Sequence, residues 1–163
     1  MLNDFRLRKI ISQEISMINI VLADDHRIVR QGVRALLEVE PDFRILAEAK
    51  DGSEAVRMVE RFHPDVLLLD LILPDMNGLE VTGVVRKRFP KTDIVILTMH
   101  ANEAYVLEAL QAGAQGYVIK DSSSEELVRA IREAAAGRCY LAPPLSEEMI
   151  ETYKKRASGQ DSF

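Results

Sequence analysis

The stretch Pro64-Asp65-Val66-Leu67-Leu68-Leu69-Asp70 decides the fold, because it runs an unbroken apolar segment directly into a carboxylate. Residues 66–69 lack the alternation of a half-exposed strand, which is typical of a central parallel strand buried on both faces. A charge at the end of such a strand is costly unless it is paired. Asp70 could simply cap the following loop, but open α/β sheets place their ligand sites at the carboxyl ends of their strands. Since polar residues also end the other apolar runs, the pattern predicts that Asp70 is the centre of a site.

Apolar runs and amphipathic segments alternate along the rest of the chain. Five strand–helix units with connections of about 2–6 residues predict a doubly wound α/β fold. We expect a five-stranded parallel sheet in the order 2-1-3-4-5, a common doubly wound order, with helices on both faces. The loop 71–77 is longer than the other connections, which favours a functional role. The predicted strands are 18–23, 44–49, 65–70, 93–98 and 116–119, and the predicted helices are 26–40, 52–62, 78–89, 102–112 and 123–136.

Composition excludes several classes of protein. The chain has 163 residues, of which 47% are hydrophobic and 29% charged, so it can bury one core of a domain of about 120 residues. A net charge of −5 gives no basic field for nucleic acid. No apolar stretch approaches the length of a membrane span, and the single cysteine, Cys139, fits a reducing compartment. These features predict a cytoplasmic protein without membrane contact.

Two tails flank the predicted domain, which covers residues 18–137. Residues 1–17 form an N-terminal extension, interpreted as an amphipathic helix or as a leader upstream of a start at Met17, and we assign it no function. Residues 138–163 are predicted to be a linker that contains a short helix opening at Ser146.

Polar side chains follow four of the five predicted strands. In the expected strand order they meet at one edge of the sheet, where three carboxylates would raise one another's pKa unless a cation joined them. Oxygen ligands with open positions suit Mg²⁺. His26 adjoins this group, and we interpret it as a helix-capping or solvated histidine rather than a zinc ligand. The polar residues are Asp24 and Asp25 after the first strand, Asp70 after the third, Thr98 after the fourth and Lys120 after the fifth.

This arrangement indicates phosphoryl transfer. A carboxylate can attack phosphorus to give an aspartyl-phosphate, and the reaction needs charge neutralisation around the moving oxygens. A bound cation, the ammonium of Lys120 and the hydroxyl of Thr98 would supply it. Asp70 is the best candidate nucleophile because it follows the central strand.

From Ile18 to Gly137 the chain resembles the receiver domain of two-component response regulators, the NarL/FixJ (LuxR-type) subfamily in particular. The resemblance implies a flavodoxin-like receiver fold with Asp70 as the phospho-acceptor. It also implies a magnesium ion held by Asp24, Asp25 and Asp70, with help from the backbone carbonyl of Ile72. The segments that carry it are ADDH at 23–26, Asp70 with LPDMNG at 73–78, LTMH at 97–100 and AGAQGYVIKD at 112–121.

The same resemblance assigns the remaining site residues. Thr98 and Lys120 would bind the phosphoryl oxygens, and Tyr117 matches the aromatic residue whose rotamer follows Thr98 in the family's switch. Many receivers have proline after the lysine, whereas Asp121 follows Lys120 here. A cis bond to a non-proline residue costs about 3–4 kcal/mol, so we expect a trans bond.

The resemblance also implies partners. They are a sensor histidine kinase as phosphodonor, a second copy of the chain in a phosphorylation-dependent homodimer, and DNA bound through a LuxR-type domain absent from these residues. Such a domain is no enzyme beyond magnesium-dependent self-phosphorylation from a phosphodonor and loss of its own phosphate.

Four rival interpretations compete with this one. A flavin binder of the same fold would place a phosphate where Asp24 and Asp25 repel it. A haloacid-dehalogenase-type phosphatase needs a second aspartate two positions after the nucleophile, where Ile72 stands, and no strand is followed by a P-loop motif. A degenerate receiver that only mediates contacts is disfavoured because every expected site residue is present.

Overall fold

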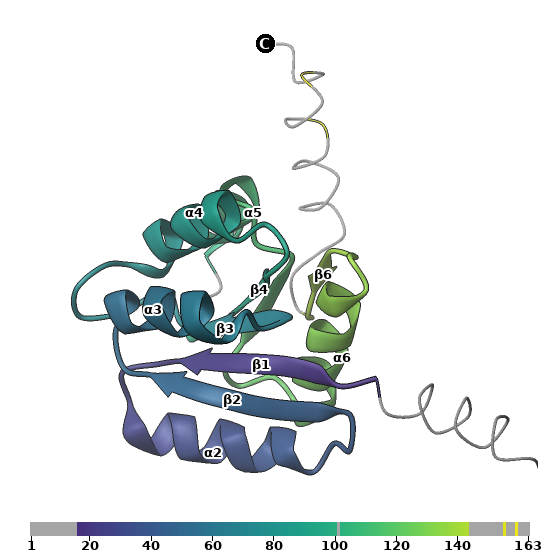
Figure 1. The fold of residues 1–163 in the computed structure, drawn as a ribbon. Helices are drawn as coiled ribbons and strands as arrows, with labels where there is room; N and C mark the ends of the chain where they lie inside the picture. Colours follow the sequence, from purple (N-terminus) through teal and green to yellow (C-terminus); the bar gives the residue numbers. More distant parts are fainter. Residues whose placement is uncertain (1–15, 101, 144–154, 156–158, 160–163) are drawn as a thin grey trace, which may run out of the picture.

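The structure is a computed structural model, and it describes residues 16–100, 102–143, 155 and 159. A parallel sheet in the order β2-β1-β3-β4-β5-β6 lies between two layers of helices (Figure 1). This arrangement confirms the predicted doubly wound fold and its strand order. The strands are β1 (Ile18–Ala23), β2 (Phe43–Ala49), β3 (Val66–Leu69), β4 (Asp93–Thr98), β5 (Gly116–Ile119) and β6 (Tyr140–Leu141).

The helices divide between the two faces of the sheet. α3 (Gly52–Phe62), α4 (Gly78–Arg88) and α5 (Glu103–Ala112) pack on one face, and α2 (Arg27–Glu38) and α6 (Ser124–Ala135) on the other. Residues 66–69 of β3 are fully buried and contribute alternately to the two hydrophobic cores. Full burial of one such aliphatic side chain contributes about 1.5–3 kcal/mol, which explains why this run forms the centre of the sheet.

The predicted ends of the elements lie within two residues of the observed ends. α2 begins at Arg27 rather than His26 and ends at Glu38 rather than Glu40. Ser123 caps α6 through the backbone N–H of Glu126, and Gly113 ends α5 with a φ of 110°, as expected for a glycine C-cap. In the described segments, no helix combines the length and apolar character that crossing a bilayer requires.

A sixth strand extends the sheet beyond the five that the sequence predicts. Gly137 adopts a left-handed φ of 79° after α6, and the chain then returns along the open edge of β5. The backbone N–H of Tyr140 donates to Gln115 O at 2.8 Å, and that of Ala142 donates to Tyr117 O at 3.1 Å. β6 was not predicted because two residues ahead of a proline carry no strand pattern. The helices predicted within 1–17 and from Ser146 lie outside the described residues, apart from positions 16, 17 and 155.

Candidate functional site

Asp70 lies where the sequence predicts it, directly after the central strand. Its backbone N–H donates to Ala23 O at 3.0 Å, which continues the pairing of β3 with β1. The side chain is buried, and its two oxygens have different partners. Oδ1 accepts the backbone N–H of Ile72 at 3.2 Å, and Oδ2 accepts Lys120 Nζ at 2.8 Å. The carboxylate is therefore fixed in direction by one backbone donor and one ammonium.

Asp24 and Asp25 follow β1 and reach the same place. Asp24 is buried, its N–H donates to Ala49 O at 3.0 Å, and its Oδ1 accepts the N–H of His26 at 2.9 Å. Asp25 is exposed. Ligand atoms of Asp24, Asp25, His26 and Asp70 all lie within 4.8 Å of one another. The structure thus brings together the three predicted carboxylates.

Lys120 joins the carboxylates across the sheet. Its Nζ lies 2.7 Å from Asp24 Oδ2 and 2.8 Å from Asp70 Oδ2, and its side chain is 13% exposed. Burial lowers the pKa of Lys120, but the hydrogen bonds that it donates to Asp24 and Asp70, with their negative charges, raise the pKa above its ordinary value. The ammonium therefore stays charged and partly offsets the repulsion between the two buried acids.

The side chain of His26 contacts the acids rather than capping the helix. It occupies the N-cap position of α2, but its side chain makes no capping hydrogen bond. Its Nδ1 lies 2.9 Å from Asp25 Oδ1 and 3.3 Å from Asp24 Oδ1, and the ring is 67% exposed. Both roles expected for His26 are observed: it is the N-cap residue of α2, with its carbonyl accepting the N–H of Arg30 at 3.0 Å, and its ring is solvated.

Thr98 and Tyr117 both contact the backbone of His100. Each side chain is fully buried; Thr98 Oγ1 accepts the N–H of His100 at 3.5 Å, and the Tyr117 hydroxyl donates to His100 O at 2.6 Å. Burial, followed by the charge of Asp70, raises the pKa of Tyr117, so its hydroxyl remains a donor. The loop after β4 therefore connects the two residues that the resemblance pairs in a switch.

The loop after Asp70 is anchored at both of its ends. The N–H of Gly78 donates to Leu71 O at 2.7 Å, and a Cβ at position 78 would lie 2.5 Å from Asp70 O, so only glycine allows this close approach. The carboxylate of Asp75 accepts the N–H groups of Gly52 and Ser53 at 2.7 and 2.9 Å. Hydrogen bonds from the Ser53 hydroxyl and N–H hold the pKa of Asp75 well below its ordinary value. The loop is thus tied to the N-terminus of α3.

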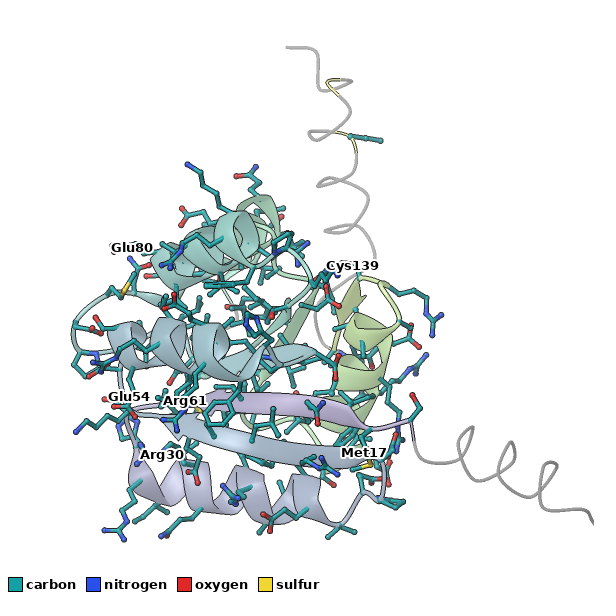
Figure 2. All side chains as sticks on the ribbon, in the orientation of Figure 1. Met17, Arg30, Glu54, Arg61, Glu80 and Cys139 are labelled. Carbon is teal, nitrogen blue, oxygen red and sulfur yellow. The ribbon has the colours of Figure 1, made fainter. Side chains whose placement is uncertain are left out.

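One residue at the site was not predicted. Arg30 lies at the N-terminal end of α2, beside the ends of β1 and β2 (Figure 2), and its Nη1 donates to Asp24 O at 2.6 Å. An arginine on a surface helix carries no site signal by itself. The one signal in the sequence is the position of Arg30 near a helix N-terminus, where a cation opposes the helix dipole and therefore indicates another role.

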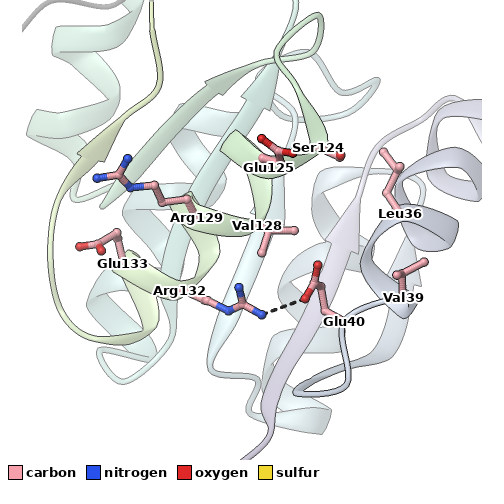
Figure 3. Close-up of a pocket in the computed structure, with 9 residues that line it drawn as sticks. All are labelled: Leu36, Val39, Glu40, Ser124, Glu125, Val128, Arg129, Arg132 and Glu133. Atoms are coloured by element: carbon pink, nitrogen blue, oxygen red, sulfur yellow. Dashed lines mark hydrogen bonds and ion pairs between the residues drawn. The ribbon is translucent and has the colours of Figure 1, made fainter.

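A separate groove lies between α2 and α6 and has a volume of about 440 Å³ (Figure 3). The ion pair of Arg132 and Glu40, at 2.9 Å, crosses it. None of the predicted site residues lines this groove, so it does not belong to the carboxylate site. Its lining residues are Leu36, Val39, Glu40, Ser124, Glu125, Val128, Arg129, Arg132 and Glu133.

Comparison with known proteins identifies one family. Residues 20–132 match the family described as the response regulator receiver domain. Among solved structures, a LuxR-family two-component response regulator from Aurantimonas sp. SI85-9A1 is similar, with a TM-score of 0.76 and 39% identity, over 88% of this chain and 99% of that chain.

Curated relatives agree with this match. The transcriptional regulatory protein DegU of Brevibacillus brevis is 37% identical over 138 residues, which are 85% of this chain and 58% of DegU. The oxygen regulatory protein NreC of Staphylococcus carnosus is 37% identical over 144 residues, which are 88% of this chain and 66% of NreC. This chain therefore spans less than two thirds of the length of either relative.

Proposed function

The chain belongs to the response regulator receiver family, and on this premise we propose that it accepts a phosphoryl group on Asp70. The observation that carries the proposal is the bridge from Lys120 to both Asp24 and Asp70 at 2.7 and 2.8 Å, inside a cluster of three carboxylates. A structural ion pair needs one acid. A second buried acid beside the same ammonium, with a third at the surface, is a net negative site suited to a further cation.

The donor set fits a magnesium ion. Asp24, Asp25 and Asp70 offer carboxylate oxygens within 4.8 Å of one another, and such oxygens are the ligands that Mg²⁺ prefers. The N–H of Ile72 contacts Asp70, so Ile72 lies at the site, and its carbonyl stays a predicted further ligand. A magnesium ion held there would offset the negative charge of the carboxylates and of the incoming phosphate.

Asp70 would act as the nucleophile. One carboxylate oxygen forms a bond to phosphorus, the bond between phosphorus and its leaving group breaks, and that electron pair departs with the leaving group. Lys120, whose pKa is raised, would transfer its ion pair from the carboxylate to the new phosphoryl oxygens. Thr98 would donate its hydroxyl to another oxygen and give up the N–H of His100.

A shift of the Thr98 side chain toward the phosphoryl group would affect Tyr117 through the backbone of His100. Thr98 and Tyr117 hold the N–H and the carbonyl of this one residue, so a shift of Thr98 changes the position that the Tyr117 hydroxyl must match. We therefore propose that phosphorylation is read out at the face built by α5, β5 and α6.

The remaining roles concern the partners of this domain. We propose a sensor histidine kinase as phosphodonor, a phosphorylation-dependent homodimer, and regulation of transcription through a LuxR-type DNA-binding domain. The relatives' descriptions as regulatory proteins, together with the share of their length outside this match, support these roles. A cytoplasmic location, and the absence of catalysis on any other molecule, belong to the same proposal.

The test is labelling by acetyl phosphate with Mg²⁺, followed by borohydride trapping and mass spectrometry. We expect one phosphoryl group, lost in Asp70→Asn and after EDTA. Asp121→Asn is the matched control, because Asp121 is an exposed carboxylate beside Lys120 and should label like the wild type. Labelling of Asp70→Asn at the wild-type level would overturn the assignment. A wild-type chain that never labels would favour a receiver that only mediates contacts.

A further inference from the structure

We propose that Arg30 is a positioning residue of the phosphorylation site, which holds the peptide between Asp24 and Asp25 so that both carboxylates face Asp70. This inference rests on the proposed function, since it concerns the same site. It adds a residue that neither the sequence analysis nor the resemblance assigns to that site.

Arg30 connects three elements at the end of the sheet. From α2, its Nη1 donates to Asp24 O at 2.6 Å, at the end of β1, and its Nε lies 3.4 Å from Glu48 Oε1 on β2. The side chain is only 16% exposed, which is low for an arginine near the start of a surface helix. Helical side chains tilt toward the N-terminus of their own helix, so residue 30 naturally reaches back over the turn that contains Asp24.

The atom that Arg30 contacts controls where Asp25 goes. The carbonyl of Asp24 and the N–H of Asp25 belong to one planar peptide group, so holding the carbonyl sets the direction in which the chain leaves Asp24. The Asp24 side chain is already fixed by Lys120 and by the N–H of His26. Asp25 is exposed, and its carboxylate contacts His26, whose ring is itself 67% exposed. Asp25 therefore depends most on the backbone that Arg30 holds.

The sequence of α2 supports a role beyond helix stability. Two of its first four residues, Arg27 and Arg30, are cations; its first turn contains no acid and its N-cap makes no side-chain hydrogen bond. Cations near a helix N-terminus oppose the helix dipole. The other helices of the described chain have a side-chain cap and an acid in the first turn. An arginine that stands at a position unfavourable for the helix, and that contacts the site, indicates a role in the site rather than in the helix.

Arg34 offers a matched control on the same helix. It lies one turn after Arg30 and pairs with the same carboxylate, with its Nη1 2.8 Å from Glu48 Oε2. Its described contacts are with Glu38 and Glu48, and none reaches Asp24. Arg34→Ala and Arg30→Ala therefore each remove one arginine from Glu48, but only Arg30→Ala also removes the contact with Asp24 O.

The test measures Mg²⁺ binding directly, by calorimetry without any phosphodonor, on wild type, Arg30→Ala, Arg30→Lys and Arg34→Ala. We expect Arg30→Ala to weaken binding about tenfold, the lower end of the effect seen when a residue behind a metal ligand is lost. Arg30→Lys should recover part of the affinity, because it restores charge without the planar fork. Arg34→Ala should stay within about twofold of wild type. With acetyl phosphate, Arg30→Ala should then need more Mg²⁺ for half-maximal labelling.

Equal Mg²⁺ affinities for Arg30→Ala and Arg34→Ala would overturn the inference. It would also be overturned if thermal unfolding showed that Arg30→Ala binds less Mg²⁺ only because less of the protein is folded. Because binding is measured without transfer, this result is independent of whether Asp70 is labelled. Normal labelling of the wild type with unchanged binding in Arg30→Ala leaves the proposed function intact and refutes Arg30 alone.

Discussion

Two helices that pack on the sheet, α3 and α2, each begin beside a pair of aspartates. The two pairs differ in the groups that bind their carboxylates. At the start of α3, Asp51 accepts the N–H of Glu54 at 2.8 Å, and Asp75 accepts those of Gly52 and Ser53. Both carboxylates are thereby bound to the first turn of the helix, where negative charge is favoured.

At the start of α2 the corresponding pair, Asp24 and Asp25, belongs to the carboxylate cluster instead. Asp24 accepts one local N–H, from His26, but its other oxygen and Oδ2 of Asp70 are held by Lys120, 50 positions from Asp70 in the sequence. Asp25 points to the same cluster. The helix itself receives no side-chain cap.

The difference shows how to separate a structural aspartate from a functional one. A carboxylate bound by the backbone N–H groups of a helix start has partners that no ligand displaces without unfolding the turn. A carboxylate held by a distant ammonium can exchange that partner for a metal ion or a phosphate. Proximity of an acid to a helix start does not distinguish the two cases, but the origin of its hydrogen-bond donors does.

Lys120→Met should give the largest effect, because it breaks the functional arrangement. It leaves two buried carboxylates without their ammonium, and breaking a buried ion pair costs about 3–5 kcal/mol. Urea denaturation at neutral pH should show a loss of about that size, with part of it regained when Mg²⁺ is added. Arg132→Met, which removes the surface ion pairs with Glu40 and Asp42, is the control. A Lys120→Met variant as stable as the wild type without Mg²⁺ would mean that the carboxylates are solvated.

Asp51→Ala should act on the other helix, with a smaller effect. Loss of an N-cap costs about 1 kcal/mol, so the free energy of unfolding should fall by that amount while Mg²⁺ affinity stays at the wild-type value.

Asp25→Ala is the counterpart: it should weaken Mg²⁺ binding and leave stability unchanged or higher, since it removes a repelling charge. If both substitutions affected stability and Mg²⁺ affinity alike, the two aspartate pairs would not differ in the way proposed.

Asp75→Asn should give the smallest effect and should show it as a pH dependence. The pKa of Asp75 lies below the ordinary 3.8, so this carboxylate stabilises the folded state above that pH and ceases to do so as the pH falls through its folded-state pKa. The stability difference between wild type and Asp75→Asn should therefore be greatest at neutral pH and shrink below 3.8. Acid titration followed by circular dichroism measures this, and a difference that grows on acidification contradicts it.

The sequence predicts the fold and the gathering of the carboxylates well because both depend on local patterns. Strands buried on both faces have continuous apolar runs, and the residue that follows each run lies at one edge of a parallel sheet. The sequence alone therefore predicts that Asp24, Asp70 and Lys120 lie together. Their chemical roles remain predictions that the labelling experiment tests.

What the sequence did not predict depends on tertiary contacts. In the sequence, Arg30 does not differ from other surface arginines. Its role depends on contacts with the ends of β1 and β2, which only the tertiary structure shows. The ring of His26 turns toward the acids because the Asp24 carboxylate already accepts its N–H. β6 forms because β5 offers an open edge, and nothing within Tyr140 and Leu141 distinguishes them from a loop.

β6 has a practical consequence for where this domain can be cut. A fragment ending at Gly137 would uncover the carbonyls of Gln115 and Tyr117, which now accept hydrogen bonds from Tyr140 and Ala142. An uncovered, apolar strand edge is a template on which another chain can add a strand and start aggregation. The segment from Tyr140 to Ala142 thus shields the sheet from self-association, and an expression fragment of the domain should extend at least through Ala142.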